Sequence, residues 1–436
     1  MDIPYSRHTL DNGLDVLVHE DHDCPIVAVN IWYHVGSKNE KPGRTGFAHL
    51  FEHLMFEGSQ HYDRGYFQPL QEAGASLNGS TNADRTNYWE VVPPNALELA
   101  LWMESDRMGF LLPALTDHKF ENQRDVVLNE RRQNYENRPY GFAGMAVVGA
   151  LYAPDHPYHW LTIGGAQDIQ AARLDDVRAF FQTYYRPRNA SLALAGDVTT
   201  ERALAMATEY FGPLDAGEPP PPVEYTAPSP LAAEQRLLLE DRVELPRLYM
   251  AWHSPALYAE DDAELDLVAD VLAGGKTSRL YRTLVFEERI ATEVAASQNS
   301  REIGGFFQIV ATAAPGRTLA ELERAIAREL NGLIEQGPNA GEIERCLAQA
   351  EAHFVYRLQT IGGFGGKSDQ LNAYNTFLGD PGFFDRDLAR YRRVMRSDLQ
   401  RAAARWLRPA SRVLLSVIPK GRLALALPDS HPVDVS

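Results

Sequence analysis

The chain has 436 residues, 44% hydrophobic and 23% charged, which predicts two or three globular domains and excludes disordered, collagen-like and coiled-coil classes. Its net charge of −17, from 42 basic and 59 acidic residues, argues against sequence-independent nucleic-acid binding, which needs a basic surface. The two cysteines, Cys24 and Cys346, lie far apart in the sequence, so neither a disulfide scaffold nor a cysteine-rich zinc module is available.

The apolar segments are too short to cross a bilayer, and the longest have only the length of a strand. The N-terminus, Met1-Asp2-Ile3-Pro4, has no basic segment followed by an apolar one. We therefore expect a soluble, cytoplasmic protein without a membrane partner. A periplasmic location is the alternative if a signal peptide has been removed.

The first half mixes strands and helices. Alternating or β-branched segments predict strands, and apolar residues at helical spacing predict helices. In chain order these are strands at 14–19 and 26–35, helices at 46–56 and 65–73, a strand at 87–92, helices at 96–108, 118–135 and 175–185, and a strand at 190–195.

A proline-rich segment near the midpoint separates two related halves. Residues 216–232 include four consecutive prolines, which predict a stiff extended linker. Asp176-Val177 and Arg186-Pro187 recur in the second half as Asp398-Leu399 and Arg408-Pro409, with the same offset for both pairs. In both halves a predicted helix precedes this second pair and a predicted strand follows it. We therefore predict a duplication, with an N-terminal domain at 1–215 and a homologous C-terminal domain at 233–436.

The second half repeats the mixture. Strands are predicted at 236–243 and 247–253, helices at 261–272, 319–336, 340–358 and 397–407, and a strand at 412–418. Because the strands and helices do not alternate strictly, we predict the α+β class, with one α/β-sandwich in each half.

The stretch His49-Leu50-Phe51-Glu52-His53 carries the chemistry. Residues four apart lie on one face of a helix, so His49 and His53 can share one metal ion. Glu52 lies beside them, where its carboxylate can accept a proton from water at the metal. This H-x-x-E-H order is the inverzincin signature. Two ordinary histidines on a helix are the alternative interpretation, and a third ligand is expected to be a carboxylate on another helix.

Residues 45–59, which include this motif, resemble the active-site helix of the pitrilysin/insulinase family of zinc metallopeptidases. In that family the third zinc ligand is a glutamate that lies further along the chain, on a helix of the form ERDVI-x-x-E. The resemblance assigns this role to Glu130, which ends the segment Gln123-Arg124-Asp125-Val126-Val127-Leu128-Asn129-Glu130 and has the family's spacing from His53. The family often has a second glutamate two helical turns before that ligand, where this chain has Gln123. An amide there can still hydrogen-bond a ligating imidazole, but without a negative charge.

The segment Gly74–Asn82 resembles the family segment that leads into an edge strand beside the zinc. In relatives that strand pairs with the substrate backbone. The resemblance therefore implies substrate binding by Asn78, Gly79 and Ser80, with ordinary turn chemistry as the alternative for the asparagines. The likeness covers essentially the whole chain and is greatest to the two-domain branch, which includes bacterial processing-type peptidases and the mitochondrial processing peptidase beta subunit.

One family feature is absent. Relatives carry an arginine and, a short distance after it, a tyrosine in the second half, which hold the substrate and stabilise the oxyanion. The matching positions here are Val285 and Thr292, and the neighbouring Tyr281 and Arg282 match positions that pack the helix in relatives. In the two-domain branch two subunits close a clam-shell chamber, so the resemblance implies that this chain is half of such a chamber. We expect a heterodimer with a homologous subunit that carries the Arg/Tyr pair; a homodimer is the alternative.

The resemblance thus implies a metalloendopeptidase with one Zn²⁺ per chain, bound by His49, His53 and Glu130, that cleaves small or unfolded peptides. Glu52 is expected to activate a zinc-bound water and then to protonate the leaving amine. A non-catalytic structural homologue, a self-sufficient homodimeric peptidase and a hydrolase of non-peptide substrates remain as alternatives. Cobalt or manganese would fit the same ligands.

Several other patterns suggest chemistry that we do not expect here. Residues 362–368 are rich in glycine, but no strand precedes them and the first glycine of a phosphate loop is missing, so a flexible break between helices is the preferred interpretation. We also prefer structural roles for both cysteines and for six other histidines, which are His19, His22, His118, His156, His159 and His253.

Overall fold

The computed structural model describes residues 2–228 and 230–435, so that Met1, Ser229 in the predicted linker and Ser436 lie outside the described residues. The chain forms two compact units. Unit 1 comprises residues 1–130, 161–224 and 354–386, and unit 2 comprises residues 131–160, 225–353 and 387–436. Each unit is therefore assembled from three separate stretches of the chain.

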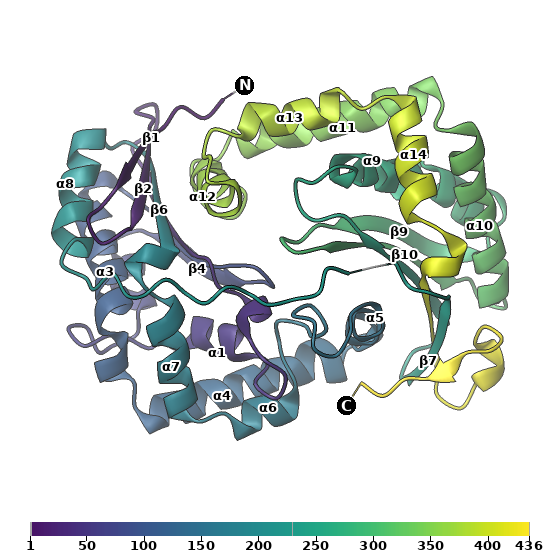
Figure 1. Ribbon diagram of the computed structural model, residues 1–436, viewed down its shortest axis with the longest axis horizontal. Helices are drawn as coiled ribbons and strands as arrows, with labels where there is room; N and C mark the ends of the chain where they lie inside the picture. The colour runs from purple at the N-terminus through teal and green to yellow at the C-terminus, as the bar shows by residue number, and fades with distance from the viewer. Residues whose placement is uncertain (1, 229, 436) are drawn as a thin grey trace. The chain divides into compact units, whose positions relative to one another are not determined.

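Unit 1 is built on a six-stranded mixed sheet (Figure 1). β2 and β6 are parallel, and the other neighbouring strands are antiparallel. The strands, in the order in which they lie in the sheet, are β1 (Ser6–Thr9), β2 (Asp15–Glu20), β6 (Ala190–Gly196), β3 (Val27–Tyr33), β5 (Thr86–Val92) and β4 (Ser76–Thr81). Its α-helices from the first half of the sequence are α1 (Phe47–Leu54), α2 (Phe67–Glu72), α3 (Leu97–Ala114), α4 (Asp117–Arg131), α6 (Ala166–Ala171), α7 (Leu174–Tyr184) and α8 (Thr200–Phe211).

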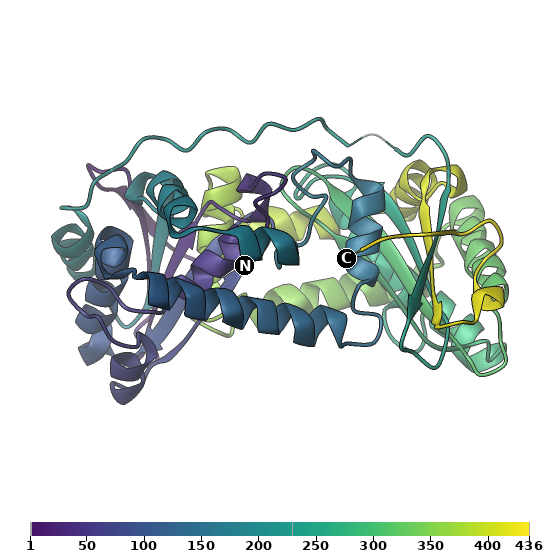
Figure 2. The same ribbon diagram turned by 90° about the horizontal axis from the view of Figure 1, so that it is seen from below.

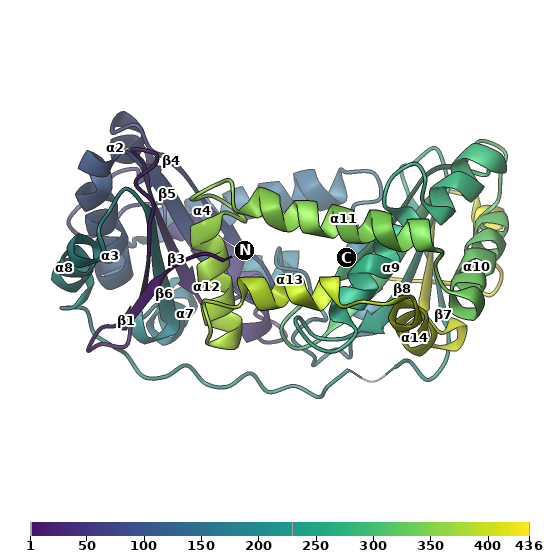
Figure 3. The same cartoon turned by 90° about the horizontal axis from the view of Figure 1, so that it is seen from above.

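Both faces of this sheet are covered, which explains why every residue of β3 is buried. Helices α1, α3 and α8 pack on one face. The opposite face is covered by α12 (Lys367–Leu378), which comes from the second half of the sequence and lies against β3 and β6 (Figure 3).

The contact between α12 and the sheet is polar and centres on one carboxylate. Asp369 is buried, and its Oδ1 accepts hydrogen bonds from Asn30, Trp32 and Asn87 at 2.9–3.2 Å. Its Oδ2 accepts the backbone N–H of Gly365 at 2.8 Å. Hydrogen bonds to a charged group contribute about 1.5–3 kcal/mol each. The side-chain N–H groups of these three strand residues thereby find an acceptor on a segment from the second half of the sequence.

Unit 2 repeats this architecture around a second six-stranded mixed sheet. In the order of the sheet its strands are β12 (His431–Pro432), β7 (Gln235–Asp241), β11 (Val413–Pro419), β8 (Arg247–Ser254), β10 (Gly305–Ala313) and β9 (Ala291–Asn299). The remaining helices of the second half are α9 (Asp262–Ala273), α10 (Leu319–Gln336), α11 (Ala340–Arg357), α13 (Phe384–Arg392) and α14 (Arg396–Trp406). The face of this sheet opposite to α9, α10 and α14 is contacted by α5 (Ala143–Leu151), from the first half of the sequence.

The predicted α+β class, with a mixed sheet and helices in each of two domains, is confirmed. The repeat is visible in detail, because α7 and α14 are of equal length, are related by the same offset as the repeated sequence pairs, and each precede a central strand of their sheet. The compact units are discontinuous, whereas the predicted domains 1–215 and 233–436 are continuous; those boundaries remain a prediction based on the repeat. Residues 215–228 contain neither helix nor strand and run extended (Figure 2).

Most predicted elements occur within one to three residues of their expected limits, and α10 matches residues 319–336. The predicted helix 118–135 changes at Arg132 into a π-helix that ends at Glu136. The predicted helix 96–108 continues to Ala114. Residues 362–366 separate α11 from α12, as expected. Among the described residues, no helix is both long enough and apolar enough to cross a membrane.

A group of buried aromatic and histidine side chains joins α5 to the second sheet. Tyr152 stacks on His156 with ring centroids 4.7 Å apart and lies edge-on to His253 at 5.2 Å. The Nδ1 of His156 accepts the N–H of Tyr158 at 3.0 Å, while its Nε2 is buried without a hydrogen-bond partner among the described residues. Burial, helped by His253 and His159 and opposed by Asp155, lowers the pKa of His156 to about 4. Burial also lowers the pKa of His253.

We expect His156→Gln to reduce the acid sensitivity of unit 2. Between pH 6.5 and about 4 the unfolded chain binds a proton at His156 that the folded chain excludes, so the free energy of unfolding falls as the pH falls through this window. The glutamine variant should lose less stability, by roughly 2 kcal/mol, between pH 7 and pH 4.5. Thermal unfolding of metal-free protein at both pH values measures this, and equal losses for variant and parent would contradict it.

Candidate metal centre

Helix α1 carries the histidines, and two carboxylates hold the chain where the helix begins. Gly46 precedes the helix in the left-handed conformation, with φ 88°. The buried Glu40 accepts the N–H groups of Gly46 and Ala48 at 3.0 and 2.8 Å. Asp168 accepts the N–H and hydroxyl of Thr45 at 3.0 and 2.6 Å. Carboxylates satisfy the free donors at a helix N-terminus and complement its partial positive charge. They therefore fix the direction in which α1 points its side chains.

His49, His53 and Glu130 converge. One ligand atom of each lies within 4.8 Å of the other two, and the imidazole centroids are 4.8 Å apart. The Oε2 of Glu130, on α4, is 3.5 Å from Nε2 of His49 and 3.4 Å from Nε2 of His53. The two histidines, spaced as on a helix, and the predicted third residue thus lie together in unit 1.

These three side chains fit a divalent metal ion. Burial, followed by the charge of His53, lowers the pKa of His49 to about 4, so this imidazole is neutral near pH 7 and has a lone pair to offer. Glu130 Oε2 is buried and has no hydrogen-bond partner among the residues that the structure describes. A buried carboxylate oxygen without a donor is costly unless a cation satisfies it. Two histidines and one carboxylate, with a further position open, form a donor set typical of catalytic zinc.

Glu52 projects from the same helix and is held by the sheet. The hydroxyl of Thr81, on β4, donates to Glu52 Oε2 at 2.5 Å. Burial raises the pKa of Glu52, and the Thr81 hydrogen bond and the charge of His53 oppose that change. One carboxylate oxygen is thereby occupied by a fixed donor. Thr81 lies within the segment Gly74–Asn82, but nothing in the sequence spacing indicates that its hydroxyl meets Glu52.

Gln123 lies on α4 two turns before Glu130, and its amide donates to the carboxylate of Glu57. Glu57 itself follows α1, one helical turn after His53. In the described chain neither imidazole receives a hydrogen bond from Gln123. The predicted hydrogen bond to a ligating imidazole is therefore replaced by one to Glu57, which ties α4 to the end of α1.

The residues predicted to contact substrate lie on β4, which is an edge strand of the sheet. Asn82 N–H donates to Arg85 O across the hairpin at 3.0 Å. Because hydrogen-bonded pairs alternate along an antiparallel ladder, the backbone groups of Asn78 and Ser80 face β5, and those of Gly79 face the open edge. Gly79 packs against Phe56 and Tyr88, which an added Cβ would approach within 3.0–3.1 Å. Of the three predicted residues, Gly79 is the one whose backbone faces the open edge, where its N–H donates to the Oδ1 of Asn78 at 2.8 Å.

The positions of the missing Arg/Tyr pair lie in unit 2. Val285 packs against the hydrophobic core there, and the Thr292 hydroxyl donates to Thr312 O at 3.4 Å. Neither side chain carries a charge or a phenol.

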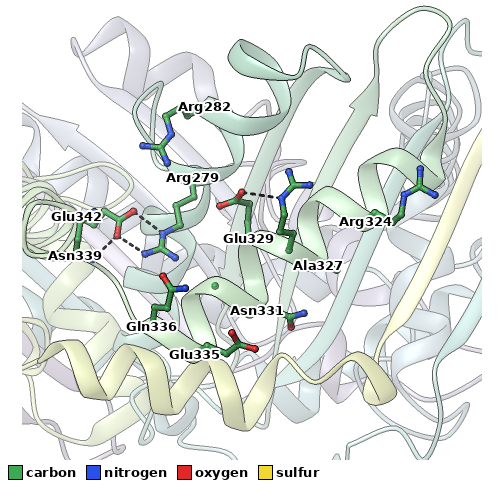
Figure 4. A pocket seen from close by; sticks show the side chains of 12 residues that line it. Arg279, Arg282, Arg324, Ala327, Glu329, Asn331, Glu335, Gln336, Asn339 and Glu342 are labelled. Atoms are coloured by element: carbon green, nitrogen blue, oxygen red, sulfur yellow. Dashed lines mark hydrogen bonds and ion pairs between the residues drawn. The ribbon is translucent and has the colours of Figure 1, made fainter.

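A cavity of about 770 Å³ in unit 2 contains several arginines (Figure 4). Arg279 makes two hydrogen bonds to Glu342, Arg328 pairs with Glu288, and Arg282 lies 3.6 Å from Glu287. Most of its positive charge is therefore compensated by neighbouring carboxylates. None of the predicted site residues lines this cavity.

Comparison with known proteins gives two family matches along the chain. The model for insulinase (peptidase family M16) matches residues 15–152, which include His49, His53 and Glu130. The model for the peptidase M16 inactive domain matches residues 171–350.

Similar proteins include the zinc protease PqqE of Helicobacter pylori, 29% identical over 362 residues that cover 82% of this chain and 81% of that protein. A probable mitochondrial-processing peptidase subunit beta of Arabidopsis thaliana is 25% identical over 80% of this chain and 67% of its own length. Among solved structures, a protease from Helicobacter pylori has a TM-score of 0.87 and 26% identity, covering 95% of this chain and all of that one. The periplasmic protease PqqL of Escherichia coli shares the fold, with a TM-score of 0.79 and 17% identity over 98% of this chain and 50% of that one.

We expect substitution of any of the three converging side chains to abolish metal binding. His49→Gln, His53→Gln and Glu130→Gln should each weaken zinc binding by more than about 100-fold, because each removes a direct ligand. Zinc content after dialysis, measured by atomic emission, tests this. His118→Gln, at an exposed position on α4, is the matched control and should retain one zinc per chain. Retention of zinc by the Glu130 variant would exclude that residue as a ligand.

Proposed function

Because the chain belongs to peptidase family M16, as its sequence motifs predicted, we propose that it is a zinc metalloendopeptidase whose site is formed by His49, Glu52, His53 and Glu130. The observation that carries this proposal is the convergence of two imidazoles and a buried carboxylate oxygen that has no donor, beside a fourth carboxylate fixed by Thr81. Its relatives include proteins named as zinc proteases.

The chain's own groups have distinct tasks in this reaction. Zinc, when bound by His49, His53 and Glu130, supplies Lewis-acid polarisation and lowers the pKa of a nearby water. Glu52 accepts a proton from the attacking water and returns it to the leaving amine nitrogen. Its Oε2 is occupied by the Thr81 hydroxyl, which leaves Oε1 as the oxygen that exchanges the proton. Burial favours the protonated form of Glu52, which suits the second half of that exchange.

The open edge of β4 supports an extended peptide as substrate. A peptide added to this edge pairs with the backbone of Gly79 and takes the place of the Asn78 side chain, whose Oδ1 accepts the Gly79 N–H in the free chain. Main-chain pairing tolerates many sequences. Thr81 lies two residues further along the same strand and contacts Glu52. A substrate paired with β4 therefore runs past the proton-accepting carboxylate.

A second subunit is part of this proposal. Val285 and Thr292 provide neither a cation nor a phenol for the oxyanion, and the chain spans half the length of the PqqL protease whose fold it shares. We infer that the active enzyme is a heterodimer with a homologous subunit that supplies those groups, and that two such chains enclose the substrate.

We expect Glu52→Gln to lower peptide hydrolysis by about 100- to 10,000-fold, because glutamine cannot accept the proton. Zinc content should stay at one ion per chain, since Glu52 is not among the three converging ligands. Cleavage of a quenched fluorescent peptide, together with metal analysis of the same sample, checks both statements. Loss of zinc in this variant would mean that the roles of Glu52 and Glu130 are wrongly assigned.

We expect the zinc-loaded chain alone to cleave peptides poorly. Addition of a homologous subunit that has an arginine and a tyrosine at the positions matching 285 and 292 should raise kcat by about 100-fold, the effect of an oxyanion-binding group. The same subunit with both residues changed to Val and Thr is the control. Full activity of the chain as a homodimer would contradict the heterodimer.

A further inference from the structure

Arg85, in the turn of the β4–β5 hairpin, is a cation beside the proposed site. Its Nη1 donates to the backbone oxygen and the hydroxyl of Ser80 at 2.9 and 2.6 Å. Its guanidinium lies 4.9 Å from the ring centroid of Trp32. Two hydrogen bonds and an aromatic ring therefore fix the guanidinium over the last residues of the edge strand.

The charge of Arg85 has no partner in direct contact. Across residues 2–228 and 230–435 it forms no ion pair with a carboxylate, its Nε is buried without a hydrogen-bond acceptor, and its Nη2 makes no hydrogen bond. Desolvation lowers its pKa, and the more distant charges of Asp369, Glu52 and Asp84 oppose that change. A guanidinium that has lost water without gaining a carboxylate is unfavourable by itself.

The nearest carboxylates are already engaged elsewhere. Asp369 accepts four N–H groups, one of them from Gly365. Asp84 lies 3.7 Å from the buried ammonium group of Lys38, and Glu52 accepts the hydroxyl of Thr81. None of them is at hydrogen-bond distance from Arg85. Because Nη1 is bonded to Ser80 and Nε is buried, Nη2 is the donor of Arg85 that is left for an acceptor from outside the chain.

The strand geometry places a substrate side chain next to this cation. Ser80 contacts Asn87, which in turn contacts Asp369, so the Ser80 side chain lies on the face of the sheet that α12 covers. Thr81 points to the opposite face, toward Glu52. Directly opposed residues of paired strands point to the same face, about 5 Å apart. A peptide paired with the open edge of β4 thus presents one side chain beside Ser80, where the arginine is already held.

We propose that Arg85 is a specificity-determining residue that binds a carboxylate of the substrate. In the substrate strand this carboxylate lies one residue away from the residue that passes Glu52. The proposal rests on the peptidase function given above. A guanidinium forms strong, charge-assisted hydrogen bonds with a carboxylate, and Nη2 is the donor of Arg85 that is left for one. The carboxylate can come from an aspartate or glutamate side chain, or from the C-terminus of a peptide that ends at this position.

Peptide binding in the absence of turnover separates these sources. The zinc-loaded Glu52→Gln protein is titrated with fluorescent peptides, acetylated and amidated at their ends, in which one glutamine at a time is replaced by glutamate. A second series shortens the all-glutamine peptide and leaves its C-terminal carboxylate free. We expect one member of one series to bind about tenfold more tightly than its uncharged counterpart, as for one charge-assisted pair.

Arg85→Gln in the same background should abolish that difference, and Arg85→Lys should retain part of it, because lysine keeps the charge without the planar guanidinium that Ser80 holds in place. Arg178→Gln, which removes an exposed arginine paired with Asp175 on α7, controls for the change in net charge and should leave the difference intact. Equal thermal stabilities of the variants establish that they are folded.

A preference for internal glutamate that Arg85→Gln abolishes identifies an acidic side chain as the ligand. A preference confined to free C-termini and likewise abolished identifies the terminal carboxylate. The proposal is overturned if neither series shows a preference, if the preference survives in Arg85→Gln, or if no peptide binds. Failure of the peptidase proposal is distinct, because it appears as absence of cleavage by the zinc-loaded protein with native Glu52.

Discussion

The site depends on how helix α1 is fixed. A helix of eight residues cannot hold its direction by its own hydrogen bonds, and a small rotation would move His49 and His53 away from Glu130. Glu40 and Asp168 prevent this by accepting donors in and just before the first turn, while Thr81 holds Glu52 from the side of the sheet. Three acceptor or donor groups from different segments thus define the position of one short helix. The packing of Phe51 against Tyr185, with ring centroids 4.3 Å apart, anchors its other face in the core.

The units are discontinuous because each sheet must be covered on both faces. A sheet buried on both faces needs a layer on each side, and in unit 1 the second layer is α12, held through Asp369 and the loop that begins at Ile361. Gly362 permits that loop to approach the strands, since an added Cβ would lie 2.6 Å from Ala28 and Val91. In unit 2 the corresponding layer is α5, from the first half of the sequence. Each sheet is therefore completed by a helix from the other half of the chain.

The sequence was sufficient for most of the elements that it predicted and for the convergence of His49, His53 and Glu130, because these depend on local periodicity and on motifs with fixed spacing. It indicated neither α8 nor the paired strands β9 and β10. It could not assign α5 or α12 to a sheet, because neither the apolar face of α5 nor the polar face of α12 specifies which surface it will meet. The glycine-rich residues 362–366 were interpreted as a break, and the contact of Asp369 with Asn30 and Trp32 depends on tertiary structure alone. The spacing of Gln123 puts it two helical turns before Glu130, but its hydrogen-bond partner, Glu57, depends on side-chain packing. Arg85 belongs to no motif used in the sequence reasoning, and its unpaired state is visible only when its neighbours are known.

The distribution of charge separates what this chain supplies from what it lacks. The converging side chains offer one negative charge, from Glu130, so a divalent cation held there would retain net positive charge with which to polarise a carbonyl group. At positions 285 and 292, by contrast, the chain has only an aliphatic side chain and a hydroxyl. Neither offers a cation to the oxyanion that would form when water adds to the carbonyl group. Arg85 does not supply this missing cation. Its guanidinium is bound to Ser80 on one face of the sheet, whereas Thr81 contacts Glu52 on the opposite face. An arginine held there can select a substrate by its charge but does not reach the reacting carbonyl, so the two proposals are independent: Arg85 would bind a substrate carboxylate, and the proposed second subunit would supply the cation for the oxyanion.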